Sequence, residues 1–245
     1  MLSKITALIR KLVLREKSSS EAYVAYLRRK GMKIGKGVKF YSPEHTTVDE
    51  QYPWMITIGD YVRITHGVVI LTHDYSWAIL KKKAPAGEAE GAILGASGHV
   101  KIGNNVFIGM NAIITRNVTI GDNVIIGAGS VVTRDCLDNG VYAGSPARRV
   151  MELDEFYRRR QAAQLEEAVA LARGYYDRFG KKPEKEIFHE YFMLFADARQ
   201  AAESEVFRNK MKKCDNPEAS YSYLDQHKPL FIDYNAFLEH CFPEA

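Results

Sequence analysis

The chain has 245 residues, of which 46% are hydrophobic and 26% charged, a composition typical of a globular protein with one or two domains. Its net charge of +4 is unevenly divided: residues 1–150 carry 20 Lys/Arg against 12 Asp/Glu, and residues 151–245 carry 14 against 18. The basic first part suits an anionic ligand, but the sequence has no zinc-finger spacing or aromatic–basic ribonucleoprotein motif, which argues against nucleic acid.

Cysteine usage and apolar runs point to a cellular compartment. The three cysteines are scattered without metal-ligand spacing and favour a reducing environment. No apolar run approaches the roughly 18 residues that a membrane span needs, and the N-terminus is a poor secretory signal. We therefore predict a cytoplasmic protein without a metal site.

Residues 1–33 are predicted to form an N-terminal helical segment. Residues 2–17 place apolar side chains on one helical stripe and lysines and arginines elsewhere. This pattern fits a helix that covers the end of the next domain, and it also fits weak association with an anionic membrane surface. The first use is the commoner and is preferred here.

A six-residue repeat follows from Ile102 onward. The successive hexads are IGNNVF, IGMNAI, ITRNVT, IGDNVI, IGAGSV and VTRDCL. The first place is always Ile or Val, the fifth is small, and the fourth is Asn, Gly or Asp, which tolerate a left-handed backbone. Short strands that turn a corner every six residues must wind into a three-sided coil of 18 residues, and the coils stack about 4.8 Å apart.

The same phase begins at Ile34, returns at Ile58 and stops at His73, which takes the fourth place of its hexad. The chain then leaves the repeat through a loop, residues 74–99, and resumes it at Val100. Histidine tolerates a left-handed corner, so a purely structural role for His73 stays open. A long loop in a compact domain is more often functional than idle.

Counting by sixes also predicts which residues stack on His73. Thr133 and Arg134 fall on the same edge of the coil, two coils away, or about 10 Å at strand spacing. Arg148 is expected about one coil further along. An imidazole and a cationic end on one edge suit a cofactor with phosphates at one end and its reactive group at the other.

The repeat is absent after Val150, and residues 151–245 are predicted to be helical. One helix is expected from Leu153 to a stop at Gly180, and a second begins after Pro183. The aromatic residues of this acidic region are expected to form a small core. The region has no recognisable catalytic signature.

Over about residues 34–150 the chain resembles the hexapeptide-repeat acyltransferases. The resemblance is carried by "LTHDYSW" before the loop, by "VKIGNNVFIGMNAIITRNVTIGDNVIIGAGSVVTRDC" and by the closing "VYAGSPARRV". It is closest to the O-acetyltransferases of capsule and O-antigen polysaccharides and to maltose and galactoside O-acetyltransferases. The family implies a mainly β fold, a left-handed parallel β-helix, here flanked by the two helical regions.

The resemblance also implies roles for individual residues. His73 matches the general base. The positions that match cofactor-binding residues are Phe107, Met110, Ala128, Thr133, Arg134 and Arg148. Phe107 stands where relatives commonly have Trp, and Met110 replaces a smaller residue. Asp74 and Trp77, at the start of the loop, are expected to bind the acceptor, although Trp77 equally suits a role in anchoring the loop.

These features predict an acetyl-CoA-dependent O-acetyltransferase that modifies a sugar hydroxyl in cell-surface polysaccharide synthesis. His73 would remove the hydroxyl proton, a form of general-base help worth about 10²–10⁴ in rate. The family implies a homotrimer with each active site between two subunits. Cys136 holds an inward place and is expected to pack rather than react.

Three other functions are compatible with parts of the pattern. The same fold and cofactor serve N-acetylation of an amino-sugar nucleotide. A metal-binding β-helix, as in γ-class carbonic anhydrases, requires two histidines five residues apart, a spacing that His66, His73 and His99 do not reproduce. A non-catalytic scaffold explains the repeat but not the combination of histidine, loop and arginine.

Overall fold

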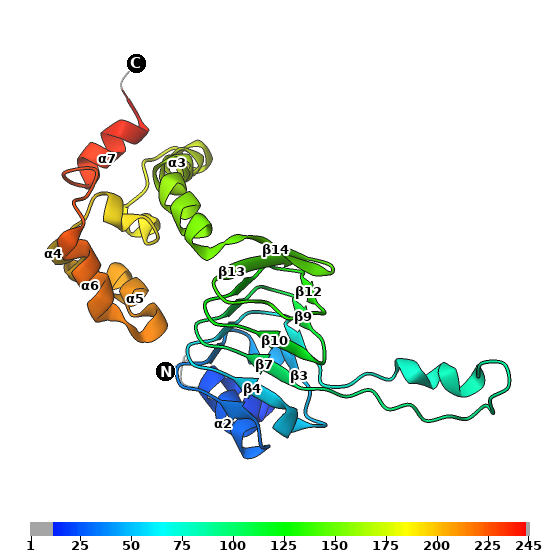
Figure 1. The fold of residues 1–245 in the computed structure, drawn as a ribbon. Coiled ribbons are helices and arrows are strands. Elements are labelled where there is room, and N and C mark those ends of the chain that lie inside the picture. The colour runs from blue at the N-terminus through cyan, green and yellow to red at the C-terminus, as the bar shows by residue number, and fades with distance from the viewer. Residues whose placement is uncertain (1–11, 244–245) are drawn as a thin grey trace. The chain divides into compact units, whose positions relative to one another are not determined.

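The computed structural model describes residues 12–243 and divides into two compact units, Met1–Phe156 and Tyr157–Ala245. The first unit is a stack of parallel strands and the second is helical (Figure 1). Residues 2–11, most of the predicted first helix, lie outside the described residues. Within the described part, every helix is too short or too polar to cross a bilayer.

Twelve short strands fall in rotation on three parallel sheets. The strands are β1 (Lys33–Ile34), β2 (Lys39–Phe40), β3 (Thr47–Val48), β4 (Ile56–Ile58), β5 (Arg63–Ile64), β6 (Val69–Ile70), β7 (Val100–Ile102), β8 (Phe107–Ile108), β9 (Ile113–Ile114), β10 (Val118–Ile120), β11 (Ile125–Ile126) and β12 (Val131–Val132). The first sheet is β1-β4-β7-β10, the second begins β2-β5-β8-β11, and the third is β3-β6-β9-β12. Each strand pairs in parallel with the third strand after it, so the chain winds into a three-sided coil as the hexads predict.

The interior of the coil is filled by the first and fifth places of the hexads. All twelve of these positions from Ile102 onward are buried: Ile102, Val106, Ile108, Ala112, Ile114, Val118, Ile120, Val124, Ile126, Ser130, Val132 and Cys136. Burying one Val or Ile side chain contributes about 1.5–3 kcal/mol, so stacked coils build a core that one coil cannot have.

The corners lie at the fourth places. A left-handed backbone is found at Asn105, Asn111, Asn117, Asn123 and Gly129. Their side chains also form a ladder along the stack, because the Asn105 amide donates to Asn123 Oδ1 at 2.9 Å and the Asn123 amide donates to Asn139 Oδ1 at 3.0 Å.

His73 departs from this corner pattern. It is not among the left-handed residues of the described chain, and it forms an antiparallel bridge with Ser97 instead. The structural-corner hypothesis for His73 is therefore wrong. The backbone at this point is shaped by the loop that begins here.

The loop, residues 74–97, projects from the coil as a long arm (Figure 1, cyan). Its two ends are tied by Gly98 N–H donating to Thr72 O at 2.8 Å and Asp74 N–H donating to Ala96 O at 3.1 Å. A Cβ on Gly98 would lie 1.9 Å from Asn117 Oδ1, so any other residue where the arm rejoins the coil would displace the Asn117 side chain. The arm contains two 3₁₀ turns, η4 (Ser76–Ala78) and η5 (Leu80–Lys82).

The coil is closed at both ends. At the first coil, α2 (Ser20–Arg29) packs Tyr23 and Leu27 into the same core, and the Ser20 hydroxyl accepts from Phe40 N–H at 3.0 Å. At the last coil, β13 (Gly140–Gly144) pairs with the antiparallel β14 (Ala147–Glu152), and both extend the second sheet.

The second unit consists of helices around an aromatic core. From residue 153 onward, the described helices are α3 (Leu153–Phe179), η6 (Lys185–Phe188), η7 (Phe192–Leu194), α4 (Ala198–Glu203), α5 (Glu205–Met211), η8 (Lys213–Asp215), α6 (Pro217–Gln226) and α7 (Tyr234–Cys241). The first unit also contains the short 3₁₀ turns η1 (Arg15–Ser18), η2 (Pro43–His45) and η3 (Pro53–Met55). Phe188, Phe195, Phe207 and Phe237 are buried together, with ring centroids 5.0–6.4 Å apart for the pairs in contact. These rings form the small core expected from the composition.

Candidate active site

The imidazole of His73 is held by a buried carboxylate. His73 follows β6, and Asp49 follows β3, the strand paired with β6 in the third sheet. The Nδ1–H of His73 donates to Asp49 Oδ2. The His73 side chain is 18% exposed and that of Asp49 only 4%. With Nδ1 donating, the lone pair of the neutral ring lies on Nε2, which is the arrangement that a general base requires.

Asp49 is itself fixed by three further hydrogen bonds. The Thr72 hydroxyl and N–H donate to Oδ2 at 2.5 and 2.9 Å, and Gln51 N–H donates to Oδ1 at 2.9 Å. Burial raises the pKa of Asp49, but the hydrogen bonds from Thr72, Gln51 and His73 outweigh it and leave the pKa below its usual value. The carboxylate is therefore ionised at neutral pH and stabilises a positive charge on the imidazole.

A cavity of about 360 Å³ opens beside His73. Its lining residues are Leu71, His73, Asp74, Thr115, Arg116, Asn117 and Thr133. They come from the ends of β6, β9 and β12, which are successive strands of the third sheet. The predicted residues His73, Asp74 and Thr133 therefore meet at one cavity, on the edge that counting by sixes predicts.

Arg116 and Asp74 form an ion pair at this cavity, with Nε 2.7 Å from Oδ2. Hydrogen bonds from Ser76, followed by the one from Arg116, lower the pKa of Asp74 to about 2. The carboxylate of Asp74 is thus satisfied within the protein, and Arg116 adds a cation to the wall that also holds His73.

The other predicted cofactor residues form a separate group. Phe107 lies on β8 of the second sheet, 40% exposed, and Met110 and Ala128 follow on adjacent coils, where Gly129 N–H donates to Met110 O at 2.7 Å. Arg148 lies on β14 and is exposed. The expectation that Arg148 continues the edge of Thr133 is wrong, because the chain turns back at residues 144–147 and adds an antiparallel strand to the second sheet.

Comparisons with known proteins agree with this architecture. Residues 99–134 match the family described as bacterial transferase hexapeptide (six repeats). Protein CapG of Staphylococcus aureus is 41% identical over 130 residues, which make up 53% of this chain and 71% of CapG. The chain belongs to the hexapeptide-repeat acyltransferases. The family predicted from the sequence is confirmed.

Solved structures with similarity to this acyltransferase include two acetyltransferases. A maltose O-acetyltransferase from Clostridium difficile is 28% identical, covers 61% of this chain and 83% of its own, and superposes with a TM-score of 0.39. A hexapeptide-repeat acetyltransferase from Vibrio cholerae is 22% identical, covers 60% of this chain and 89% of its own, and gives a TM-score of 0.43.

Sequence reasoning missed two residues of this candidate site. Asp49 lies in an irregular segment where the six-residue count cannot be followed, and only the buried Val48 just before it marks a strand. Arg116 had a visible signal, because Thr115–Arg116 repeats the Thr133–Arg134 pair one coil earlier.

Cys136 behaves as its inward place predicts. Burial, with a smaller effect from Asp135, raises the pKa of its thiol to about 12, so the thiolate nucleophile is suppressed. Within residues 12–243, no group of three or more His, Cys, Asp or Glu side chains is placed to hold a metal ion.

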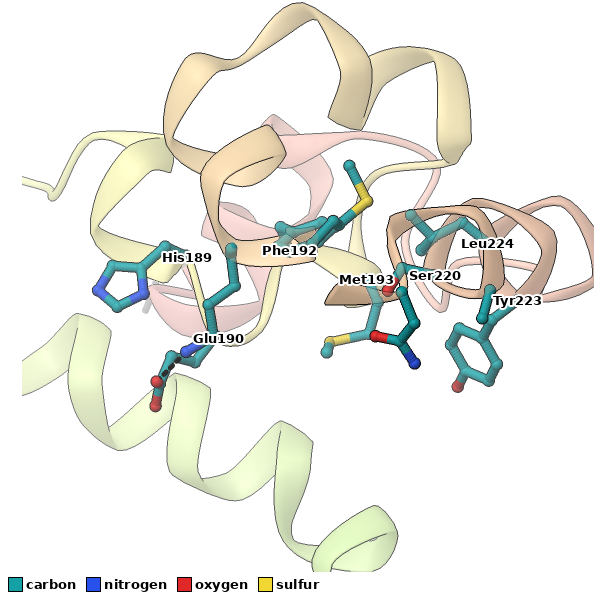
Figure 2. Close-up of a pocket in the computed structure, with 11 residues that line it drawn as sticks. His189, Glu190, Phe192, Met193, Ser220, Tyr223 and Leu224 are labelled. Atoms are coloured by element: carbon teal, nitrogen blue, oxygen red, sulfur yellow. Dashed lines mark hydrogen bonds and ion pairs between the residues drawn. The ribbon is translucent and has the colours of Figure 1, made fainter. Parts of the chain in front are cut away.

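A second cavity, of about 330 Å³, lies within the helical unit (Figure 2). Much of its wall is apolar, including Phe192, Met193 and Leu224. His189 and Glu190 lie at one end of the view and Tyr223 at the other (Figure 2). Lys210 and Glu190, which also line it, form an ion pair, but the cavity has no imidazole hydrogen-bonded to a buried carboxylate as in the Asp49–His73 pair.

Proposed function

We propose that this acyltransferase is an acetyl-CoA-dependent O-acetyltransferase that modifies a sugar hydroxyl in the cytoplasmic stage of cell-surface polysaccharide synthesis, on a left-handed β-helix. The observation that carries the proposal is the Asp49–His73 pair at a cavity whose wall also holds a cation, Arg116. A buried carboxylate behind an imidazole is the arrangement expected of a general base rather than of a scaffold.

Catalysis would proceed by direct transfer. His73 Nε2 takes the proton of the acceptor hydroxyl as its oxygen attacks the thioester carbonyl. The C–S bond then breaks, and the imidazolium returns the proton to the leaving thiolate of coenzyme A. Asp49 keeps the ring in the correct tautomer and stabilises the imidazolium, and the cavity aligns the two substrates.

The cofactor would be held by the residues that the family resemblance indicates. Thr133 lines the cavity, with Arg134 next to it in the chain, and Phe107, Met110 and Ala128 would contact the pantetheine arm. Arg148 would meet the phosphates, because it is an exposed cation beyond the last coil. Trp77 of the arm would contact the acceptor, and Asp74 would act through its ion pair with Arg116.

A homotrimer would explain why the cofactor residues form two groups. In one subunit the group of His73 and Thr133 follows the third sheet, whereas that of Phe107 and Met110 belongs to the second. Two subunits packed side by side would bring the first group of one next to the second group of the other. Each site would then lie between subunits.

The test is thiol release from acetyl-CoA in the presence of hydroxyl sugars or amino sugars, with wild type, His73→Ala and His99→Ala. His99 is the matched control, since it is an exposed histidine at the other foot of the arm. We expect turnover with hydroxyl acceptors, its loss in His73→Ala by about 10²–10⁴-fold, and normal rates in His99→Ala. Turnover restricted to amino acceptors would assign N-acetylation, and near-normal rates in His73→Ala would refute the mechanism.

A further inference from the structure

The tripeptide pattern Tyr-x-Trp occurs on both chain segments that surround His73. Tyr52-Pro53-Trp54 follows Asp49, and Tyr75-Ser76-Trp77 begins the arm. Each forms a short 3₁₀ turn, η3 and η4. The chain has only two tryptophans, and both lie in these turns.

The aromatic rings of the two turns contact one another through His73. The Tyr52 and Tyr75 rings both meet the imidazole edge to face, with centroids 5.8 and 4.9 Å away. Trp54 then contacts Tyr52 at 5.7 Å, and Trp77 contacts Tyr75 at 6.4 Å. Five rings therefore form a continuous series, with the proposed base in the middle and an indole at each end.

Gln51 fixes this series in place. Its side-chain amide donates to the Tyr52 hydroxyl at 3.1 Å, and its carbonyl accepts from the Tyr75 hydroxyl at 2.8 Å. Its backbone N–H donates to Asp49. The same segment therefore orients the base and the rings around it, as expected of a preorganised binding surface.

The aromatic series and the cavity share His73 but extend from it in different directions. Tyr52 and Trp54 follow β3, one coil below His73, whereas Arg116 and Thr133 follow β9 and β12, above it. The side with Thr133 is the one proposed to hold acetyl-CoA. The aromatic side is therefore left for the acceptor.

Two rings of the series are exposed, whereas Trp77 is half-buried, and the exposed pair points to a ligand. Trp54 is 62% exposed and Tyr75 is 59% exposed, although large aromatic surfaces are usually withdrawn from water. A pyranose presents a flat face of C–H groups that stacks on an aromatic ring and, at its rim, the hydroxyls that the proposed reaction needs. One pyranose is about as wide as one aromatic ring, and a tyrosine separates each indole from His73.

We infer that the acceptor is a saccharide of two or more linked rings. The ring to be acetylated lies at His73, and its neighbours stack on Trp54 and Trp77. The inference rests on the proposed function and specifies its substrate: a glycan chain or its multi-sugar precursor rather than a single sugar.

Tryptophan emission tests this directly, because Trp54→Phe and Trp77→Phe each leave one reporter. The probes form two series. One is N-acetylglucosamine with its β1,4-linked dimer and trimer, and the other is glucose with maltose and maltotriose. We expect emission to change in both variants, with affinity rising at least about tenfold from one ring to three. Trp54→Ala should weaken binding of the trimer by about tenfold, whereas Tyr41→Ala, an exposed aromatic outside the series, should not.

Each outcome decides the matter. No emission change with any of these sugars, equal affinity for one ring and three, or emission that responds only to protein concentration would overturn the inference; the last result would assign the rings to a contact with a second copy. Acetyl-CoA turnover at His73 without any saccharide response would leave the proposed function standing. Saccharide binding without acetyl-CoA turnover would leave the inference about the acceptor standing and contradict the proposed function.

Discussion

Asp74 and Arg116 are 42 residues apart in sequence, yet Arg116 Nε donates to Asp74 Oδ2 at 2.7 Å where the arm leaves the coil. Asp74 also accepts from the Ser76 N–H and hydroxyl. One carboxylate therefore joins the first turn of the arm to the neighbouring coil. It fixes the position of the segment that carries Tyr75 and Trp77 beside His73.

The first prediction concerns the titration of Asp74. Its pKa is about 2, below the ordinary value, so its anchoring contribution is complete above about pH 4 and is lost as the pH falls toward 2. Arg116→Gln should raise this pKa part of the way to the ordinary value, as measured by NMR of the Asp74 carboxyl carbon. Lys101→Gln, a cation on another sheet, is the control. An unchanged pKa in Arg116→Gln would show that the ion pair does not form in solution.

The second prediction concerns Asp49. Asp49→Asn keeps the shape of the side chain but removes the negative charge. That charge stabilises the imidazolium and fixes the tautomer of the neutral His73 ring. We expect kcat to fall by about 10²–10⁴-fold with little change in the KM for acetyl-CoA. Thr72→Val is the control, since it removes a hydrogen bond to Asp49 without touching His73, and it should cost far less. Equal losses in the two variants would mean that Asp49 acts only by holding the local fold.

The third prediction concerns Arg148. If its guanidinium contacts the phosphates of coenzyme A, Arg148→Ala should raise the KM for acetyl-CoA about tenfold or more and leave kcat nearly unchanged. Lys101→Ala serves as the matched loss of an exposed cation. Steady-state kinetics at fixed ionic strength measure both constants, and an unaltered KM would exclude Arg148 from cofactor binding.

The fourth prediction concerns the corner at Asn123, where φ is +55°. Asn123→Ala should lower the free energy of unfolding relative to Asn123→Gly by about 1–2 kcal/mol, because alanine is strained in the left-handed region and glycine is not. Both variants lose the ladder bonds to Asn105 and Asn139, so their difference isolates the backbone effect. Equal unfolding midpoints in denaturant would contradict it.

The sequence predicts the coil well because each hexad specifies which side chains point inward and where the chain turns a corner. An inward Ile or Val, a small fifth residue and an Asn corner recur at Ile102 and at Ile120, and the paired strands match residue for residue. The same count places Thr133 on the edge of His73. The count remains valid across the inserted loop because the chain rejoins the coil after Gly98 in the same six-residue phase.

The rest of the site depends on contacts that periodicity does not encode. Asp49 is 24 residues before His73, in a segment interrupted by Pro43 and Pro53, where β3 pairs with β6 at an offset of 22 residues (Val48 with Ile70) rather than 18. Arg148 was expected on the edge of Thr133 because the repeat contains no signal that the chain turns back after Gly144. Counting by sixes fails in irregular segments, and here such a segment also supplies Asp49, the partner of the proposed base.

The antiparallel β14 has a consequence beyond the site. A stack of parallel coils ends in rows of backbone N–H and C=O groups that another chain can join, which is the route to end-to-end fibres. Reversing the last strand on β13 means that a second copy cannot continue the second sheet in the parallel register. At the other end, the Ser20 hydroxyl already occupies the N–H of Phe40. Both features limit end-to-end growth through the second sheet.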